Sequence, residues 1–466
     1  MYFCRIYLSI YLSIYLSIYA HARARAHLYT LFLVYVRRCQ AKTSTASSEI
    51  VVAMASCGLL AKTDFPLYTV RALDEKHFLV AGGGGPVKTG VANALEIFDV
   101  SFADERIKAT SVTHLDTGSQ AVMNSATYSD GRHHLLAIGM DNECHLYSLK
   151  YKVVQTEDKK SEGEARHRKT KKSDEKENSK NGPAKIVTFD VESLGLVCNE
   201  SETEFQKVVQ FSPDGSLLFT GSTEGILRAW EHSKLKIAYQ FKAHSSDIDD
   251  LAVCPNGKWL VTISKDNSGI VWNAKDGKKH TDLKWAAKTT EQYRFRGCCF
   301  GCVEGDKEKI NLYTINIPSR RAVKPLPCYV TKWDCTSFKS SKIEKTGTEI
   351  LSALCVSADG DYLGLGTISG SVSVYISFSL QKLYHVPASH GIFVTGVEFL
   401  PTSSSTRAVT GKHDFNLLSI SPDYMVQIHQ PSEGWFLRIE VGLWIITIGA
   451  LTILALIIWL LGILGY

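Results

Sequence analysis

Short runs of Val, Ile, Leu and Phe, separated by Gly, Asp, Asn and Ser, fill the chain between about residues 64 and 431. These runs show little of the three-to-four-residue spacing that marks an amphipathic helix. Short apolar runs bounded by turn residues are typical of strands joined by tight connections. The pattern therefore predicts an all-β domain over residues 64–431.

Two segments of this domain repeat each other. Residues 211–215 read Phe-Ser-Pro-Asp-Gly and precede Trp230, and residues 253–257 read Val-Cys-Pro-Asn-Gly and precede Trp272. The two glycines, 215 and 257, and the two tryptophans, 230 and 272, are each 42 residues apart. This is the period of WD-repeat blades, each of four strands. Dividing the domain by about 40–50 residues gives seven or eight blades, and we predict the usual closure, a seven-bladed WD-repeat β-propeller.

Within the second repeat, four polar and aromatic residues fit the hydrogen-bonded set that ties a blade's turn to its third strand: His244, Ser264, Asp266 and Trp272. We interpret them as scaffold. The expected blades cover about residues 64–110, 111–195, 200–240, 241–282, 283–345, 346–387 and 388–431. Because the first and last strands of a propeller normally share a blade, the chain near Phe65 should pair with the chain near His429.

The C-terminal segment, residues 441–466, carries no charged side chain and is rich in Leu and Ile. About 20 apolar residues suffice to cross a bilayer as a helix, so we predict a single transmembrane anchor over residues 441–462; the alternative is a buried core helix. Arg438 precedes the span and no Lys or Arg follows it, which favours a cytosolic propeller. The twelve cysteines show no regular framework, as expected for a reducing compartment. We interpret Cys298, Cys299 and Cys302 as strand and loop cysteines.

Two further segments have unusual composition. Residues 1–53 form a low-complexity extension, in which Ser-Ile-Tyr-Leu recurs as a repeated TCTA element would encode it. Met54 could then be the true start, and a signal peptide is the competing interpretation. The second segment, 157–183, alternates acidic and basic residues without aromatics and is predicted to be a disordered insertion. With a net charge of only +5, nucleic-acid binding is not expected.

Four consecutive glycines, Gly82 to Gly85, lie between two strand-like segments. Glycine permits positive φ angles and lets main-chain groups converge on an ion or a partner. A phosphate-binding P-loop is excluded because Val87 stands where it needs glycine before Lys88, and because a strand rather than a helix follows. A flexible hairpin without a role remains the simpler alternative.

Together the glycine run, the repeats and the apolar C-terminus resemble the Sec-type guanine-nucleotide exchange factors, WD-repeat proteins that activate the Sar GTPase at the endoplasmic reticulum. The resemblance covers about residues 65–466. It is carried by residues 65–68, 81–85, 88–90, 206–209, 241–244, 327–329, 363–366, 370–372 and 389–391.

The resemblance implies a protein of the endoplasmic reticulum membrane that promotes GDP release from Sar and so starts COPII coat assembly. It also implies a potassium ion held by main-chain oxygens of Gly82, Gly83, Gly84 and Gly85. Exchange is then assigned to Gly90, Val91 and Asn93, with Asn93 bonding to the GTPase, and contacts with the GTPase to Lys88, Thr89 and Asp116. Pro86 and Ala92 depart from related loops, so individual ion ligands cannot be carried over.

Three other classes of function compete with exchange activity. A membrane-tethered WD-repeat scaffold without exchange activity is the main alternative, because most propellers are interaction platforms. It would have no need of the glycine loop. A nuclear transcription regulator fits poorly with a terminal membrane span. For a bond-making enzyme, no triad, paired carboxylates or metal constellation stands out in the sequence.

Overall fold

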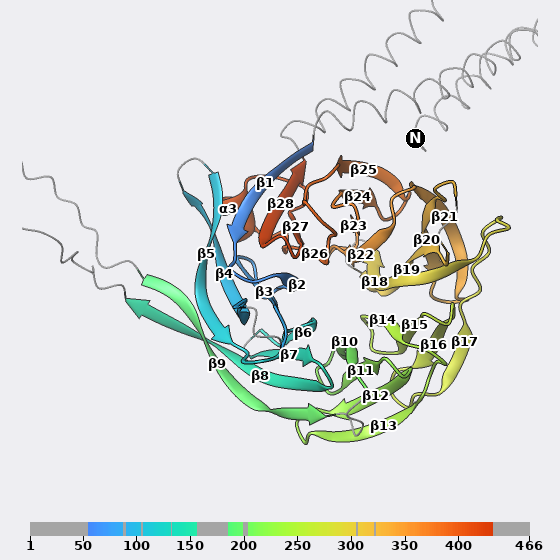
Figure 1. Cartoon of the computed structure of the whole chain (residues 1–466), viewed down its shortest axis with the longest axis horizontal. Helices are drawn as coiled ribbons and strands as arrows, with labels where there is room; N and C mark the ends of the chain where they lie inside the picture. The colour runs from blue at the N-terminus through green and yellow to red at the C-terminus, as the bar shows by residue number, and fades with distance from the viewer. Residues whose placement is uncertain are drawn as a thin grey trace, which may run out of the picture. The chain divides into compact units, whose positions relative to one another are not determined.

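The computed structural model describes residues 55–86, 90–103, 106–131, 133–155, 185–198, 204–303, 306–320 and 323–431. They form seven antiparallel sheets of four strands each (Figure 1). The innermost strands of successive sheets contact one another around a closed ring, from β2 through β6, β10, β14, β18 and β22 to β26 and back to β2. The predicted seven-bladed all-β propeller is confirmed.

Each of the first six blades is a run of four consecutive strands. The first three are β2(Leu67–Ala72), β3(His77–Gly83), β4(Asn93–Ala103), β5(Arg106–Asp116); β6(Asn124–Ser129), β7(His134–Met140), β8(Glu143–Gln155), β9(Lys185–Cys198); and β10(Gln206–Phe211), β11(Leu218–Ser222), β12(Ile226–Glu231), β13(Lys236–Lys242). The next three are β14(Ile248–Val253), β15(Trp259–Ser264), β16(Gly269–Asn273), β17(Lys279–Asp282); β18(Tyr293–Val303), β19(Asp306–Pro318), β20(Cys328–Asp334), β21(Lys339–Gly347); and β22(Leu351–Val356), β23(Tyr362–Thr367), β24(Val372–Ile376), β25(Gln381–Val386).

The seventh blade joins the two ends of the described chain. Its strands are β26(Gly396–Phe399), β27(Leu417–Ile420) and β28(Met425–Pro431), with β1(Ala55–Lys62) as the outer strand. Ala55 pairs with Pro431 and Cys57 with His429. The propeller therefore begins at Ala55, and the predicted start at residue 64 is wrong. The closing strand precedes Phe65, which is itself fully buried.

Apolar side chains fill the spaces between neighbouring blades. Leu79 and Ile97 of blade 1, for example, share one buried cluster with Leu136 and Ile138 of blade 2. Strands buried on both faces read as nearly continuous apolar runs, which is the pattern that predicted the domain. One short helix, α3(Ser404–Thr410), lies in the described part of blade 7, and the Ser403 side chain caps its N-terminus.

The scaffold residues predicted in blade 4 form the expected hydrogen-bonded set, except that Thr262 takes the place of Ser264. The His244 ring lies 2.7 Å from the Thr262 hydroxyl and 3.3 Å from the Asp266 carboxylate. The Trp272 indole N–H donates to the same Thr262 oxygen at 2.8 Å. Thr262, and not Ser264, therefore joins the histidine to the tryptophan, while Ser264 donates to the Ser246 carbonyl at 3.2 Å.

Three predicted features fall on parts of the chain that the structure does not describe: the extension 1–53, the charged insertion 157–183 and the anchor 441–462. In the described ranges, no helix combines the length and the apolar character that a bilayer crossing requires. Cys298, Cys299 and Cys302 all lie in β18.

Candidate functional site

The glycine-rich segment joins β3 to β4 in blade 1. Gly83 pairs with Asn93 at the base of the connection, and the Gly84 N–H donates to the Ala92 carbonyl at 3.3 Å. Pro86 and Gly90 are exposed. The connection therefore projects from an edge of the propeller as an accessible loop. Residues 87–89 lie outside the described residues, so the predicted contacts of Lys88 and Thr89 stay predictions.

Gly82 and Gly83 are strand residues for which a side chain would have no room. A Cβ atom on Gly82 would lie 1.9 Å from the Pro66 carbonyl oxygen, and one on Gly83 would lie 2.2 Å from Asn93 Oδ1. Gly83 also has a φ of +140°. The requirement for glycine at these two positions therefore follows from close packing, without invoking an ion.

The loop beyond the strand needs glycine for its backbone angles instead. Gly85 and Gly90 have φ values of +82° and +79°, and a Cβ atom at either position would meet nothing within 4 Å. Such left-handed angles are adopted readily by glycine alone. Val91, next to Gly90, packs against the apolar cluster shared by blades 1 and 7, so the loop is pinned close to its exposed turn.

Asn93 is the organising residue of this loop. Its side-chain oxygen accepts the Gly85 N–H at 2.8 Å, and its side-chain NH₂ donates to the Gly85 carbonyl at 3.1 Å and to the Gly118 carbonyl at 2.9 Å. Only 7% of the residue is exposed. Its amide is thus engaged within the chain, an arrangement that favours a positioning role over direct bonding to a partner.

A second connection, from β5 to β6, lies against the glycine loop. The Thr117 N–H donates to the Asn93 carbonyl at 3.0 Å, and the Val122 N–H donates to the Gly82 carbonyl at 3.3 Å. Asp116 is the last residue of β5, and its exposed carboxylate accepts the Gly118 N–H at 2.7 Å. The structure therefore brings Asp116 to the same side of the blade as the loop, and its contact with a GTPase stays a prediction.

The main-chain oxygens of the loop have the right chemistry for an alkali cation. Potassium is held in proteins by rings of backbone carbonyls. The carbonyls of Gly85 and Ala92, which lie outside the strands, accept hydrogen bonds from the Asn93 side chain and the Gly84 N–H, and a carbonyl oxygen has a second lone pair available. Carbonyl oxygens of Gly84 and Gly85 would be suitable ligands, whereas Gly82 and Gly83 belong to the strand.

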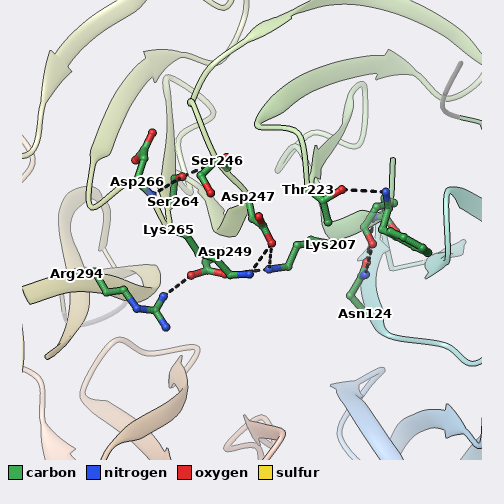
Figure 2. Close-up of polar contacts among 12 residues, drawn as sticks. Asn124, Lys207, Thr223, Ser246, Asp247, Asp249, Ser264, Lys265, Asp266 and Arg294 are labelled. Atoms are coloured by element: carbon green, nitrogen blue, oxygen red, sulfur yellow. Dashed lines mark hydrogen bonds and ion pairs between the residues drawn. The ribbon is translucent and has the colours of Figure 1, made fainter. Parts of the chain in front are cut away.

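Sequence reasoning missed a cluster of charged residues at the inner strands of blades 3 to 5. The Lys207 ammonium lies 3.1 Å from Asp247 and 3.0 Å from Asp249. Lys265 lies 2.6 Å from Asp247, and Arg294 lies 2.6 Å from Asp249 (Figure 2). Burial acts to raise the pKa of Asp247, but hydrogen bonds from Lys265 and Lys207 outweigh it and lower that pKa. Nothing in the sequence marked these residues, because each comes from a different strand or connection.

Comparison with known proteins agrees with this architecture. The family described as "WD domain, G-beta repeat" matches residues 206–231 and 235–273. Among solved structures, Raptor from Chaetomium thermophilum superimposes with a TM-score of 0.56 at 13% identity, covering 82% of this chain and 29% of that one. At that identity the similarity shows the fold alone.

Similarity over nearly the whole length is found with guanine nucleotide-exchange factors. "Guanine nucleotide-exchange factor SEC12" of Mus musculus is 37% identical over 407 residues, which cover 84% of this chain and 95% of the relative. "SEC12-like protein 1" of Arabidopsis thaliana is 30% identical over 200 residues, covering 42% of this chain and 46% of the relative. The chain therefore belongs to the SEC12 family of WD-repeat guanine nucleotide-exchange factors.

Proposed function

We propose that the protein is a guanine-nucleotide exchange factor that promotes GDP release from the Sar small GTPase at the endoplasmic reticulum membrane, and thereby starts COPII coat assembly. The observation that carries this proposal is the glycine loop, which is accessible and shaped by Asn93. It occurs in a chain whose similarity to the mouse SEC12 exchange factor covers 95% of that relative's length. A passive scaffold would not need such a loop.

Exchange of this kind requires differential binding and no covalent step. An exchange factor binds the nucleotide-free GTPase more tightly than the GDP-bound form, and the difference in binding free energy weakens GDP binding by the same amount. Each tenfold weakening corresponds to about 1.4 kcal/mol. A loop that is already ordered loses little conformational entropy on binding. In this proposal Asn93 holds the loop in its binding shape, while Lys88, Thr89, Gly90 and Val91 form or support the part that meets the GTPase.

A potassium ion would complete the loop. When bound by main-chain oxygens of Gly84 and Gly85, the ion would supply positive charge that holds converging carbonyls together. Gly85 is already fixed by two of the three hydrogen bonds that the Asn93 side-chain amide makes. Asn93 would therefore orient one of the ion's candidate ligands, which links the two features in one physical arrangement.

Attachment to the membrane is the remaining part of the proposal. Residues 441–462 are uncharged and long enough to cross a bilayer as a helix. The described propeller ends at Pro431, so only a short tether would separate it from such an anchor. Arg438 on the N-terminal side favours a propeller in the cytosol.

The test is release of fluorescent GDP from purified Sar GTPase by the full chain in lipid nanodiscs, measured in potassium and in sodium buffers. We expect faster release than without the chain, and a stronger effect in potassium. Acceleration of equal size in both buffers would remove the potassium ion from the mechanism. No acceleration in either buffer would favour the membrane-tethered scaffold.

A further inference from the structure

Exposed apolar side chains gather in the connections on one face of the propeller. In each blade the connection between the second and third strands lies on the same face as the connection to the next blade, and the glycine loop belongs to this face. Its connections carry six apolar side chains that are 38–51% exposed, here called the apolar ring: Met123, Phe205, Ile368, Ile392, Phe393 and Tyr424. In the described connections of the opposite face, the large exposed apolar residues are Leu235 and Phe378.

Backbone hydrogen bonds connect the ring to the glycine loop on one side. The Val122 N–H donates to the Gly82 carbonyl at 3.3 Å, which places Met123 directly beside the loop. The side chains of Asn124 and Gln206, each the neighbour of a ring residue, are bonded to each other at 3.0 Å. Met123 and Phe205 therefore continue the surface from blade 1 across to blade 3.

The other side of the ring runs through blades 7 and 6. The Thr63 N–H donates to the Tyr424 carbonyl at 3.1 Å, so Tyr424 adjoins the segment that leads into blade 1. The Val394 N–H donates to the Thr367 carbonyl at 3.0 Å, and their neighbours Phe393 and Ile368 are consequently close. The apolar ring thus flanks the glycine loop on both sides.

Charged groups complement the ring near Phe205. The Thr223 hydroxyl accepts the Phe205 N–H at 3.1 Å and fixes its backbone. Beside it stand Lys207 and Lys265, which share Asp247 (Figure 2). Lys207, Lys265 and Arg294 form ion pairs with Asp247 and Asp249, so these five residues together have one excess positive charge. Aromatic side chains and arginine are enriched at the energetic centre of protein interfaces, and lysines belong to the polar rim around it.

We propose that the apolar ring is the main docking surface for the small GTPase in its nucleotide-free state, an inference that rests on the proposed exchange function. The glycine loop alone is too small to bind a folded partner, because specific interfaces bury about 800 Å² on each side. An exchange factor needs this additional area to bind the nucleotide-free state tightly enough to displace GDP. The ring supplies apolar area on the face from which the loop projects, and the excess positive charge of the neighbouring Lys207, Lys265 and Arg294 cluster suits an acidic patch on the partner.

The test compares three variants of the full chain. Phe205→Ser and Phe393→Ser remove ring residues on either side of the loop. Phe378→Ser is the matched control, because Phe378 is 79% exposed on the opposite face. We expect each ring variant to lower kcat/KM for GDP release about tenfold or more and to weaken capture of the nucleotide-free GTPase, while Phe378→Ser leaves both unchanged.

The possible outcomes separate this proposal from the exchange function itself. If the wild type accelerates GDP release and the ring variants behave like Phe378→Ser, the docking surface is wrong and the exchange function stands. If the wild type does not accelerate release, both are wrong. Hydrogen exchange of the wild-type chain provides a readout free of substitutions: nucleotide-free GTPase should protect residues 121–124, 204–206 and 391–394 but not 377–380. Protection of the ring without GTPase, growing with protein concentration, would assign it to contact between copies of the chain and overturn the proposal.

Discussion

Replacement of Asn93 by Ala tests whether the shape of the glycine loop drives exchange. The change removes three hydrogen bonds, two to Gly85 and one to the Gly118 carbonyl. At about 1 kcal/mol each, these bonds stabilise the closed loop by about 3 kcal/mol at most. Gly85 is partly exposed, so water can replace part of that loss, and about 2 kcal/mol remains. We expect kcat/KM for GDP release to fall by a factor of about 10 to 100.

The matched control is Asn416→Ala, which also removes a buried asparagine. Asn416 accepts a 2.6 Å hydrogen bond from Gln430 and belongs to blade 7, just before β27. It should lower the melting temperature without changing GDP release. If Asn93 positions a potassium-binding loop, its variant should also need more potassium for half-maximal exchange, which a general loss of stability would not cause. Unchanged release kinetics in a folded Asn93→Ala variant, or equal losses in the two variants, would refute the reasoning.

Two further predictions concern stability. Gly82→Ala should destabilise the propeller by about 2–3 kcal/mol, because its Cβ would overlap the Pro66 carbonyl. At Gly85 a Cβ meets open space, so Gly85→Ala should cost only about 1 kcal/mol for the left-handed backbone angle. Equal urea midpoints for the two variants would contradict the packing argument. Burial, followed by the nearby His390, lowers the pKa of His429 to about 3, so below about pH 6.5 the unfolded chain takes up a proton at His429 that the folded chain does not. The free energy of unfolding should therefore fall as the pH is lowered from about 6.5 to about 5 on account of this residue, with a slope that approaches about 1.4 kcal/mol per pH unit near pH 5. Urea titrations of wild type and His429→Gln should show a shallower pH dependence in the variant, and parallel curves would count against this role.

The propeller could be predicted because its blades repeat locally. The equal spacing of Gly215 and Gly257, and of Trp230 and Trp272, depends on contacts within one blade. The closing strand could not be found in this way. Residues 55–62 pair with residues 425–431, and neither local composition nor the repeat period reports a contact between the two ends of the domain.

The glycine loop could be located from the sequence, but the structural reason for each of its glycines could not. A run of glycines has the same appearance in a sequence whether it holds an ion or avoids a clash, and Gly82 and Gly83 avoid clashes. The partners of Asn93 are main-chain groups of Gly85 and Gly118, which any residue could supply. In the same way, Thr262 and Ser264 both carry hydroxyls, and only the strand register decides which one meets the histidine.

The pairing of β1 with β28 has a mechanical consequence. β28 is the third strand of its sheet, held by β27 on one side and by β1 on the other. A pulling force applied to the chain beyond Pro431 and directed along β28 would load both rows of hydrogen bonds in shear, so that they would have to break together rather than one after another. Pulled in this way, the domain should resist unfolding far better than if the same force peeled an outer strand from its sheet.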